Sequence, residues 1–234
     1  MDAMINRRIR SLCFFLLMVS KSFGQTSDSI PKAVPYRILG NDTLQAYIFE
    51  PAVRSGDRPV ILLFHGGAWR IGEAAWTFNR AKAFAEKGMV AISIDYRLAN
   101  NGMSPADGVE DACFAFEWTR KHAKELGIDT KRVAGYGVSA GGHLVAAAAL
   151  LPSVKGVKIG DVSRPDVLLL FSPPLNLAND GYFISIMAGK GNAADYSPLA
   201  FVGKNLPPTL IIQGALEYLS RGRPSVVEKS KHPE

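Results

Sequence analysis

The chain has 234 residues, of which 47% are hydrophobic and 21% charged, and this balance is that of one globular domain or at most two. The formal net charge is +6, but residues 1–24 carry four basic side chains against one acidic one, so the charge without them is +3. A surplus this small argues against a nucleic-acid partner.

The first 24 residues have the pattern of a secretory signal peptide. A basic stretch, residues 7–10, precedes the apolar run SLCFFLLMVS of residues 11–20, and small residues follow it up to Gly24. The apolar run is shorter than the ~20 residues that a membrane-spanning helix needs. The sequence therefore predicts cleavage near Gly24, a secreted or periplasmic location, and no stable membrane association after cleavage.

Cleavage would remove Cys13 and leave Cys113 as the remaining cysteine. Cys113 lies in an apolar helical stretch, ACFAFEW, where a small buried hydrophobe is the expected role. No disulfide and no cysteine-based metal site is therefore predicted. Nothing else in the sequence implies a metal or an organic cofactor.

Residues 25–35 are predicted to be a polar leader, followed by one domain over residues 36–219. Residues 36–49 indicate a β-hairpin that turns at Gly40-Asn41-Asp42. The remaining elements are expected in this order: strand 59–64, helix 77–86, strand 89–94, helix 105–126, strand 132–136, helix 140–151, strand 166–171, an irregular stretch, and strand 209–213. This alternation predicts an α/β fold, with a mostly parallel sheet and helices on both faces.

The strongest chemical motif is Gly137-Val138-Ser139-Ala140-Gly141, between a predicted strand and a predicted helix. This is the context of a G-x-S-x-G nucleophile elbow, in which glycines let the chain turn sharply and expose the serine hydroxyl. The N-terminus of the following helix favours developing negative charge. The pattern predicts Ser139 as a catalytic nucleophile.

A second glycine-rich motif, His65-Gly66-Gly67-Ala68-Trp69, directly follows the buried strand 59–64. It is similar to the HGGG-type oxyanion loop, in which backbone N–H groups approach a substrate oxygen. Gly66, Gly67 and Ala68 are the predicted loop contribution, and the N–H of Ala140 completes the oxyanion hole. His65 is expected to shape this loop and not to act as a base.

Together with Asp95-Tyr-Arg-Leu98, these motifs resemble the hormone-sensitive-lipase-like and feruloyl-esterase-like branch of the α/β-hydrolases over residues 36–219. The resemblance implies an α/β-hydrolase fold and hydrolysis of carboxylic esters. It also implies that Asp95 takes part in a hydrogen-bond network behind the oxyanion loop. Ala68 departs from the glycine that many members carry.

The resemblance places the acid of the catalytic triad at the third position beyond Gly214, which is Glu217, where members usually carry aspartate. A solvated loop glutamate is the other interpretation of Glu217. Asp180 and Asp195 are less favoured acids.

The catalytic histidine of the family follows one further helix and one further strand, whereas 17 residues follow Glu217. His232 is the histidine in this tail and is a weakly supported base. His122 is expected to be solvated, and His143 to be packed or hydrogen-bonded. The sequence therefore predicts that the last helix and strand are missing, and that residues 220–234 are an atypical basic tail, loosely attached, with His232 out of reach of Ser139.

Three functions remain open from the sequence. The first is a serine carboxylic-ester hydrolase that forms an acyl-enzyme and acts on a small-molecule ester, either a short acyl ester or an acylated carbohydrate. The second is a catalytically incompetent relative, truncated, frameshifted or used for binding only. The third is a serine peptidase of the same fold. The short segment 172–208 predicts a small lid and an open pocket, which favours short acyl groups.

Overall fold

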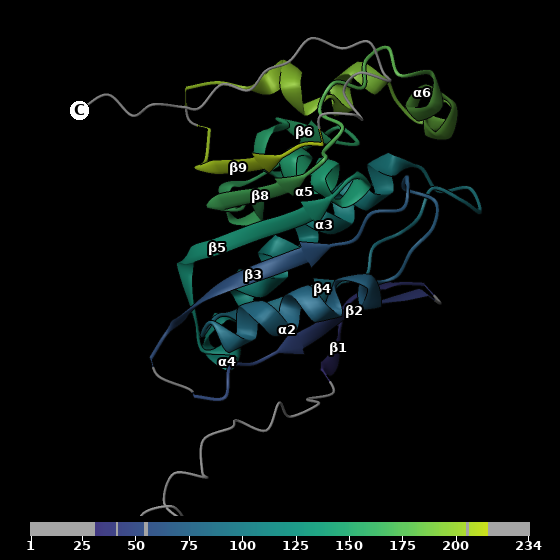
Figure 1. Ribbon diagram of the computed structural model, residues 1–234. Coiled ribbons are helices and arrows are strands. Elements are labelled where there is room, and N and C mark those ends of the chain that lie inside the picture. The colour runs from purple at the N-terminus through teal and green to yellow at the C-terminus, as the bar shows by residue number, and fades with distance from the viewer. Residues whose placement is uncertain (1–30, 41, 54–55, 205, 215–234) are drawn as a thin grey trace, which may run out of the picture. The chain divides into compact units, whose positions relative to one another are not determined.

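The computed structural model describes residues 31–40, 42–53, 56–204 and 206–214. A seven-stranded sheet runs through them in the order β1-β2-β4-β3-β5-β8-β9 (Figure 1). β1 pairs antiparallel with β2 and β2 with β4, and all later neighbours are parallel. The strands of this sheet are β1 Lys32–Leu39, β2 Asp42–Phe49, β3 Arg58–Phe64, β4 Val90–Ile94, β5 Ile128–Val138, β8 Val167–Phe171 and β9 Thr209–Ile212.

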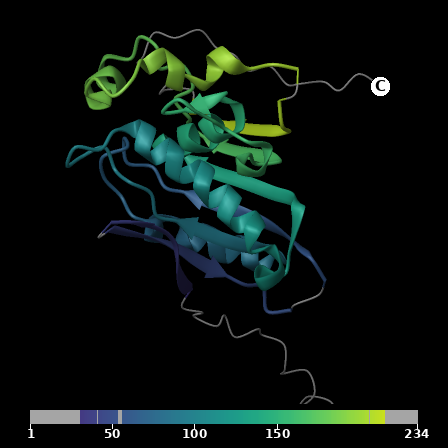
Figure 2. The same cartoon turned by 180° about the vertical axis from the view of Figure 1, so that it is seen from behind.

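Helices cover both faces of the sheet, as the two opposite views in Figures 1 and 2 show. α2 (Phe78–Glu86) lies on one face, and α3 (Pro105–Lys121) and α5 (Ala140–Leu150) pack together on the other. Alternate residues of β3 enter the two apolar clusters: Leu62 lies in the cluster under α3 and α5, and Ile61 in the one under α2. This two-sided burial explains why strand 59–64 is an unbroken apolar run.

The predicted α/β fold with its mostly parallel sheet is confirmed. Short elements join the main ones: η1 Ala74–Thr77, α4 Ala123–Leu126, η2 Asp161–Ser163, α6 Gly181–Met187, η3 Ala193–Tyr196, η4 Pro198–Phe201, and the separate two-stranded pair β6 Ser153–Val154 and β7 Val157–Lys158. Three of these, α6, η3 and η4, lie in the stretch that the sequence predicted to be irregular.

Two boundaries differ from the sequence prediction. β1 begins at Lys32, because residues 32–35 pair with β2, so the last part of the predicted leader belongs to the sheet. The predicted helix 105–126 is two helices, α3 and α4, which meet at His122. The His122 ring stacks on Trp118 at 4.6 Å and is partly buried, so the expectation of a solvated histidine is wrong.

Cys113 is a buried free thiol in α3, as predicted, and burial raises its pKa to about 12. Among the described helices, none has the length and the apolar character required to cross a bilayer. The predicted signal peptide, residues 1–24, and the predicted basic tail, residues 220–234, lie outside the described residues.

Candidate active site

Ser139 occupies a one-residue turn between β5 and α5, where the sequence predicted a nucleophile elbow. Its backbone has φ 50° and ψ −116°, a conformation that a residue with a side chain rarely adopts. A methyl group on Gly137 would lie 2.3 Å from the carbonyl oxygen of Gly141. One on Gly141 would lie 2.2 Å from the carbonyl oxygen of Phe64, at the end of β3. Both glycines are therefore required for this turn to form against the neighbouring strand.

The loop that follows β3 lies directly against this turn. A methyl group on Gly66 would be 3.5 Å from the Cβ of Ser139. The next three residues all have positive φ: 122° at Gly67, 50° at Ala68 and 62° at Trp69. The carbonyl oxygen of Gly67 accepts hydrogen bonds from the backbone N–H groups of Arg70 and Ile71, at 3.0 Å each. The two motifs, 73 residues apart, thus form one site at the carboxyl edge of the sheet.

The N–H groups predicted to hold an oxyanion are available in this arrangement. Within the described part of the chain, the backbone N–H groups of Gly67 and Ala68 donate no hydrogen bond. Ala140 is the first residue of α5, so its N–H has no acceptor inside the helix. Backbone N–H groups that have no protein acceptor and meet at the start of a helix can bind an anion. The catalytic roles of Ser139, Gly66, Gly67, Ala68 and Ala140 stay predictions.

His65 is held inside the loop and has no free position for proton transfer at Nδ1. That nitrogen lies 2.6 Å from the carbonyl oxygen of Gly66, and because a carbonyl only accepts, Nδ1 carries the proton. The ring stacks on Tyr96 at 4.3 Å, and the Tyr96 hydroxyl donates to the His65 carbonyl oxygen at 2.9 Å. Burial lowers the pKa of His65. These contacts agree with the loop-shaping role expected from the sequence.

Asp95 lies behind the loop, as the resemblance implied. Its carboxylate accepts hydrogen bonds from the backbone N–H groups of Gln45 and Ala74 and from the Tyr47 hydroxyl. Burial raises the pKa of Asp95, and these hydrogen bonds oppose the rise. Ala74 begins the 3-10 turn that follows the loop, so Asp95 connects β2, the neighbour of edge strand β1, with the chain that leaves the oxyanion loop.

Arg97 joins the segment that follows β4 to α3. Its Nε and Nη2 donate to the two carboxylate oxygens of Asp111 at 2.9 and 2.8 Å, and its backbone N–H donates to Asp111 at 2.9 Å. Arg37 of β1 contacts the same carboxylate, and the Asp111 side chain is fully buried. Paired guanidinium groups keep this carboxylate hydrogen-bonded on several sides. The sequence analysis did not predict this cluster, because its members are far apart along the chain.

The sequence analysis also missed the contacts that reach the oxyanion loop from other elements. Trp69 donates its indole N–H to Nδ1 of His143 in α5 at 3.1 Å. Tyr182 of α6 donates its hydroxyl to the carbonyl oxygen of Ala68 at 3.1 Å. His143 was expected to be packed or hydrogen-bonded, and this is confirmed. No local pattern could have identified its partners, since Trp69 is 74 residues away.

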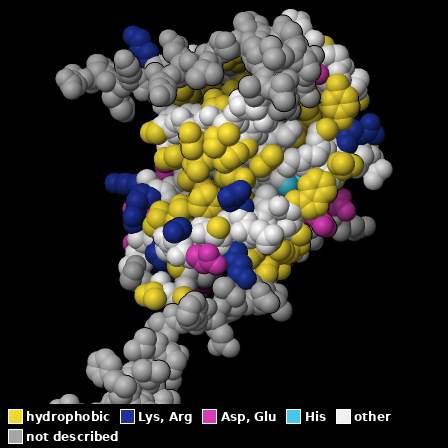
Figure 3. Space-filling model, viewed as in Figure 1, with side chains coloured by type: hydrophobic (Ala, Val, Ile, Leu, Met, Phe, Trp, Pro, Cys, Tyr) yellow, Lys and Arg dark blue, Asp and Glu magenta, His cyan; other side chains and the backbone are white. Residues whose placement is uncertain are grey.

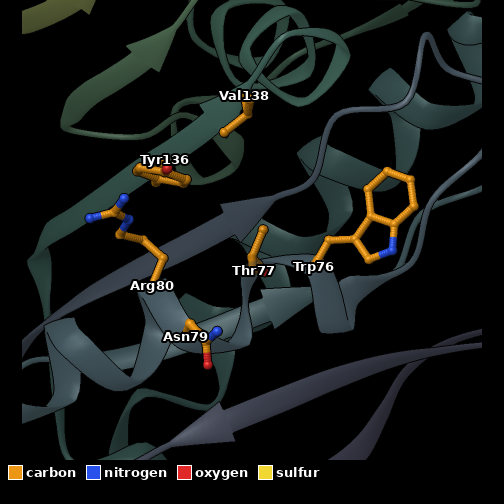
Figure 4. A pocket seen from close by; sticks show the side chains of 6 residues that line it. All are labelled: Trp76, Thr77, Asn79, Arg80, Tyr136 and Val138. Carbon is orange, nitrogen blue, oxygen red and sulfur yellow. The ribbon is translucent and has the colours of Figure 1, made fainter.

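A hollow of about 380 Å³ adjoins the elbow on the α2 side of the sheet. Figure 4 shows its lining: Trp76 and Thr77 come from η1, Asn79 and Arg80 from α2, and Tyr136 and Val138 from β5. Val138 immediately precedes Ser139. The predicted acid Glu217 and the predicted base His232 lie outside the described residues. Asp180, a less favoured acid, caps α6 by accepting a hydrogen bond from Phe183 N at 2.9 Å.

Comparison with known proteins shows that the chain is similar to esterases. A family model described as BD-FAE matches residues 47–162. A probable isoprenylcysteine alpha-carbonyl methylesterase from Oryza sativa subsp. japonica is 29% identical over 84% of this chain and 51% of its own length. An arylesterase from Saccharolobus solfataricus is 34% identical over 70% of this chain and 52% of its own length. The chain spans about half the length of these curated relatives.

Solved structures agree with the sequence relatives. The propionate-bound form of an esterase from the planctomycete Thermogutta terrifontis is 32% identical, with a TM-score of 0.70, over 78% of this chain and 71% of that one. This similarity covers more than two thirds of each chain.

Proposed function

The chain belongs to the hormone-sensitive-lipase-like esterases of the α/β-hydrolase family, and from this premise we propose that it hydrolyses carboxylic esters through an acyl-enzyme formed on Ser139. One observation carries the proposal. Ser139 is held in a strained turn, and the loop of Gly66, Gly67 and Ala68 lies against it with N–H groups that have no protein partner in the described chain.

The proposed reaction has two acyl transfers. The Ser139 hydroxyl oxygen attacks the ester carbonyl carbon while a base removes its proton, and the carbonyl oxygen becomes an oxyanion held by the N–H groups of Gly67, Ala68 and Ala140. Collapse of this intermediate breaks the bond to the alcohol, which leaves with the proton. Water then attacks the acyl-enzyme in the same way and releases the carboxylic acid and the free serine.

The identity of the base decides whether this chain is active. The three described histidines are engaged elsewhere: His65 by Gly66 and Tyr96, His122 by Trp118, and His143 by Trp69 and Tyr196. Glu217 remains the predicted acid, and His232 remains a weakly supported base that the sequence predicts to be out of reach of Ser139. If neither serves, the chain is a catalytically incompetent relative, because loss of triad members costs about 10⁴- to 10⁶-fold in rate.

Short acyl esters, or acylated carbohydrate, are the proposed substrates. The stretch between β8 and β9 forms the short elements α6, η3 and η4, which leaves little chain to build a deep lid. The Thermogutta terrifontis esterase, a relative of similar fold, has been solved with propionate bound. A small acyl group fits an open site at the edge of the sheet.

The proposal is tested with p-nitrophenyl acetate and butyrate, and with fluorophosphonate labelling located by mass spectrometry. We expect ester hydrolysis and labelling of Ser139, both abolished in Ser139→Ala. His232→Ala decides the role of the tail: if His232 is the base, this variant loses both readouts, and if it is not, both are unchanged.

A matched control is Ser172→Ala, at the end of β8 and outside the predicted machinery, which should leave hydrolysis intact. Absence of hydrolysis and labelling in the wild-type chain would support the incompetent relative. Cleavage of aminoacyl p-nitroanilides in preference to esters would instead identify a peptidase.

A further inference from the structure

Among the described histidines, His143 is the one that connects α5, the helix that begins after Ser139, with both the oxyanion loop and η3. It lies one helical turn after Ser139, on α5, and is fully buried. Its Nδ1 accepts from the Trp69 indole at 3.1 Å, and its Nε2 lies 2.8 Å from the carbonyl oxygen of Tyr196 in η3. We propose that His143 is a positioning residue that holds the oxyanion loop in its reactive conformation through Trp69. The inference rests on the proposed function of that loop.

The two partners of His143 select one form of its ring. An indole N–H can only donate, so Nδ1 must present its lone pair to Trp69. A carbonyl oxygen can only accept, so Nε2 must carry the proton toward Tyr196. His143 is therefore the neutral Nε2–H tautomer, and a second proton on Nδ1 would displace the Trp69 indole.

Aromatic packing fixes the same geometry. The rings of Trp69, His143 and Phe183 of α6 meet edge to face, with centroids 5.0 to 5.4 Å apart for each pair. Trp69 is 6% exposed and the other two are fully buried, so the indole has little freedom to take another position. A hydrogen bond buried in such a cluster is hard to replace by water.

The oxyanion loop needs contacts from other elements to keep its conformation, because its own backbone is strained. Ala68 and Trp69 have positive φ without being glycine, and such conformations persist where surrounding contacts enforce them. The hydrogen bonds at Trp69 are the one from its indole N–H to His143 and the one from the Ala99 N–H to the Trp69 carbonyl oxygen at 2.6 Å. Only the first of these connects the loop to the helix that carries the nucleophile.

The test compares His143→Leu, which removes both hydrogen bonds, with His143→Gln, whose amide offers one acceptor and one donor. His122→Leu is the matched control, since it also removes a histidine packed on a tryptophan but lies away from the site. The measurements on the full chain are kcat and KM for p-nitrophenyl butyrate, the rate of fluorophosphonate labelling at Ser139, and the ¹⁵N-resolved indole N–H signal of Trp69.

We expect His143→Leu to lower kcat and the labelling rate by roughly tenfold to a hundredfold, because a displaced oxyanion donor loses its contact in the transition state. KM should change little, since that contact is weak in the ground state. The Trp69 indole proton should shift upfield and exchange faster with solvent. His143→Gln should recover most of the rate, and His122→Leu should leave all readouts unchanged.

Trp69→Phe provides a second route if His143→Leu does not fold. It keeps an aromatic ring at this position, removes the donor and should lower the labelling rate to the same extent. In combination with His143→Leu it should cause no further loss. Unchanged rates in His143→Leu or in Trp69→Phe would overturn the inference. A wild-type chain inert to esters and fluorophosphonate would overturn the proposed function, and the indole signal would then decide by itself whether His143 holds Trp69.

Discussion

Single glycines decide whether the catalytic turn can form. Gly141 is the strictest case, because a methyl group there would meet the backbone oxygens of Phe64 and His65 at 2.2 and 2.5 Å. Neither oxygen can move without shifting the end of β3 and the start of the oxyanion loop. A small side chain at this position therefore disturbs both halves of the site.

We predict that Gly141→Ala destabilises the protein by about 3 kcal/mol or more, because overpacking against backbone cannot be relieved by a rotamer change. Thermal and urea unfolding measure this loss. Gly181→Ala is the control: Gly181 begins α6 and has open space at its Cα, so alanine there should leave stability unchanged or raise it by a few tenths of a kcal/mol. Equal unfolding midpoints for the two variants would contradict the close approach at Gly141.

At the scale of elements, the Arg97–Asp111 pairing joins the segment after β4 to α3 and, through Arg37, to β1. The Asp111 side chain is fully buried and both guanidinium groups are nearly so. Removing one partner of a buried ion pair leaves the other charge without compensation, which costs far more than the pair itself contributes.

Asp111→Asn keeps the shape of the side chain and removes its charge, so we expect a loss of about 3 kcal/mol in the free energy of unfolding. The exposed pair Lys121–Glu117 on the same helix is the comparison, and Lys121→Ala should cost less than about 1 kcal/mol. Chemical denaturation of both variants decides between these values. A loss at Asp111 as small as that at Lys121 would mean that the cluster is screened by solvent.

A second feature at this scale is the apolar sheet surface at β8 and β9, on the α2 side. Val167, Leu210 and Ile212 are 38%, 53% and 47% exposed there, beside the half-buried Leu169 and Phe171. Figure 3 shows hydrophobic side chains gathered over this part of the sheet. On this face α2 and η1 pack chiefly over β2, β4 and β3. An exposed surface and edge of this kind favour self-association.

We predict that Leu210→Lys lowers concentration-dependent self-association, measured by sedimentation velocity across a dilution series. A charge placed on an apolar edge strand opposes pairing with a second chain. Val157→Lys is the control, because Val157 is 68% exposed on β7, in the separate two-stranded sheet. If both variants associate like the wild type, contacts elsewhere drive the association.

For the whole molecule, the buried neutral histidines make the free energy of unfolding depend on pH in the acid range. Burial lowers the pKa of His143 to about 4, from 6.5 for the free side chain, and lowers that of His65 as well. The groups packed on His143 are the Trp69 and Phe183 rings and the Tyr196 carbonyl, none of which carries a charge. Its ring is therefore protonated more readily in the unfolded chain than in the folded one.

This difference predicts that the free energy of unfolding falls as the pH drops from 6.5 to 4, by up to about 3 kcal/mol from His143. Above pH 6.5 both states are neutral and the contribution is complete. Urea unfolding of the wild type and His143→Gln at several pH values isolates this effect, since glutamine does not titrate. Parallel curves for the two proteins would show that His143 keeps an ordinary pKa.

The sequence by itself determined the order and type of the main elements and the two glycine-rich motifs. Apolar runs such as residues 59–64 and the sharp turn around Ser139 are local properties, and local chemistry predicts them. The edge of the sheet where both motifs meet also followed from the parallel pattern, because the carboxyl ends of parallel strands lie together.

Only the tertiary structure decided which side chains hold the motifs in place. The bond from Trp69 to His143, the pairing of Arg97 with Asp111, and the contact of Tyr182 with Ala68 join residues separated by 74, 14 and 114 positions. Hydrophobic periodicity assigns a residue to a face of its own element, whereas the partner on the opposing element depends on how the elements pack.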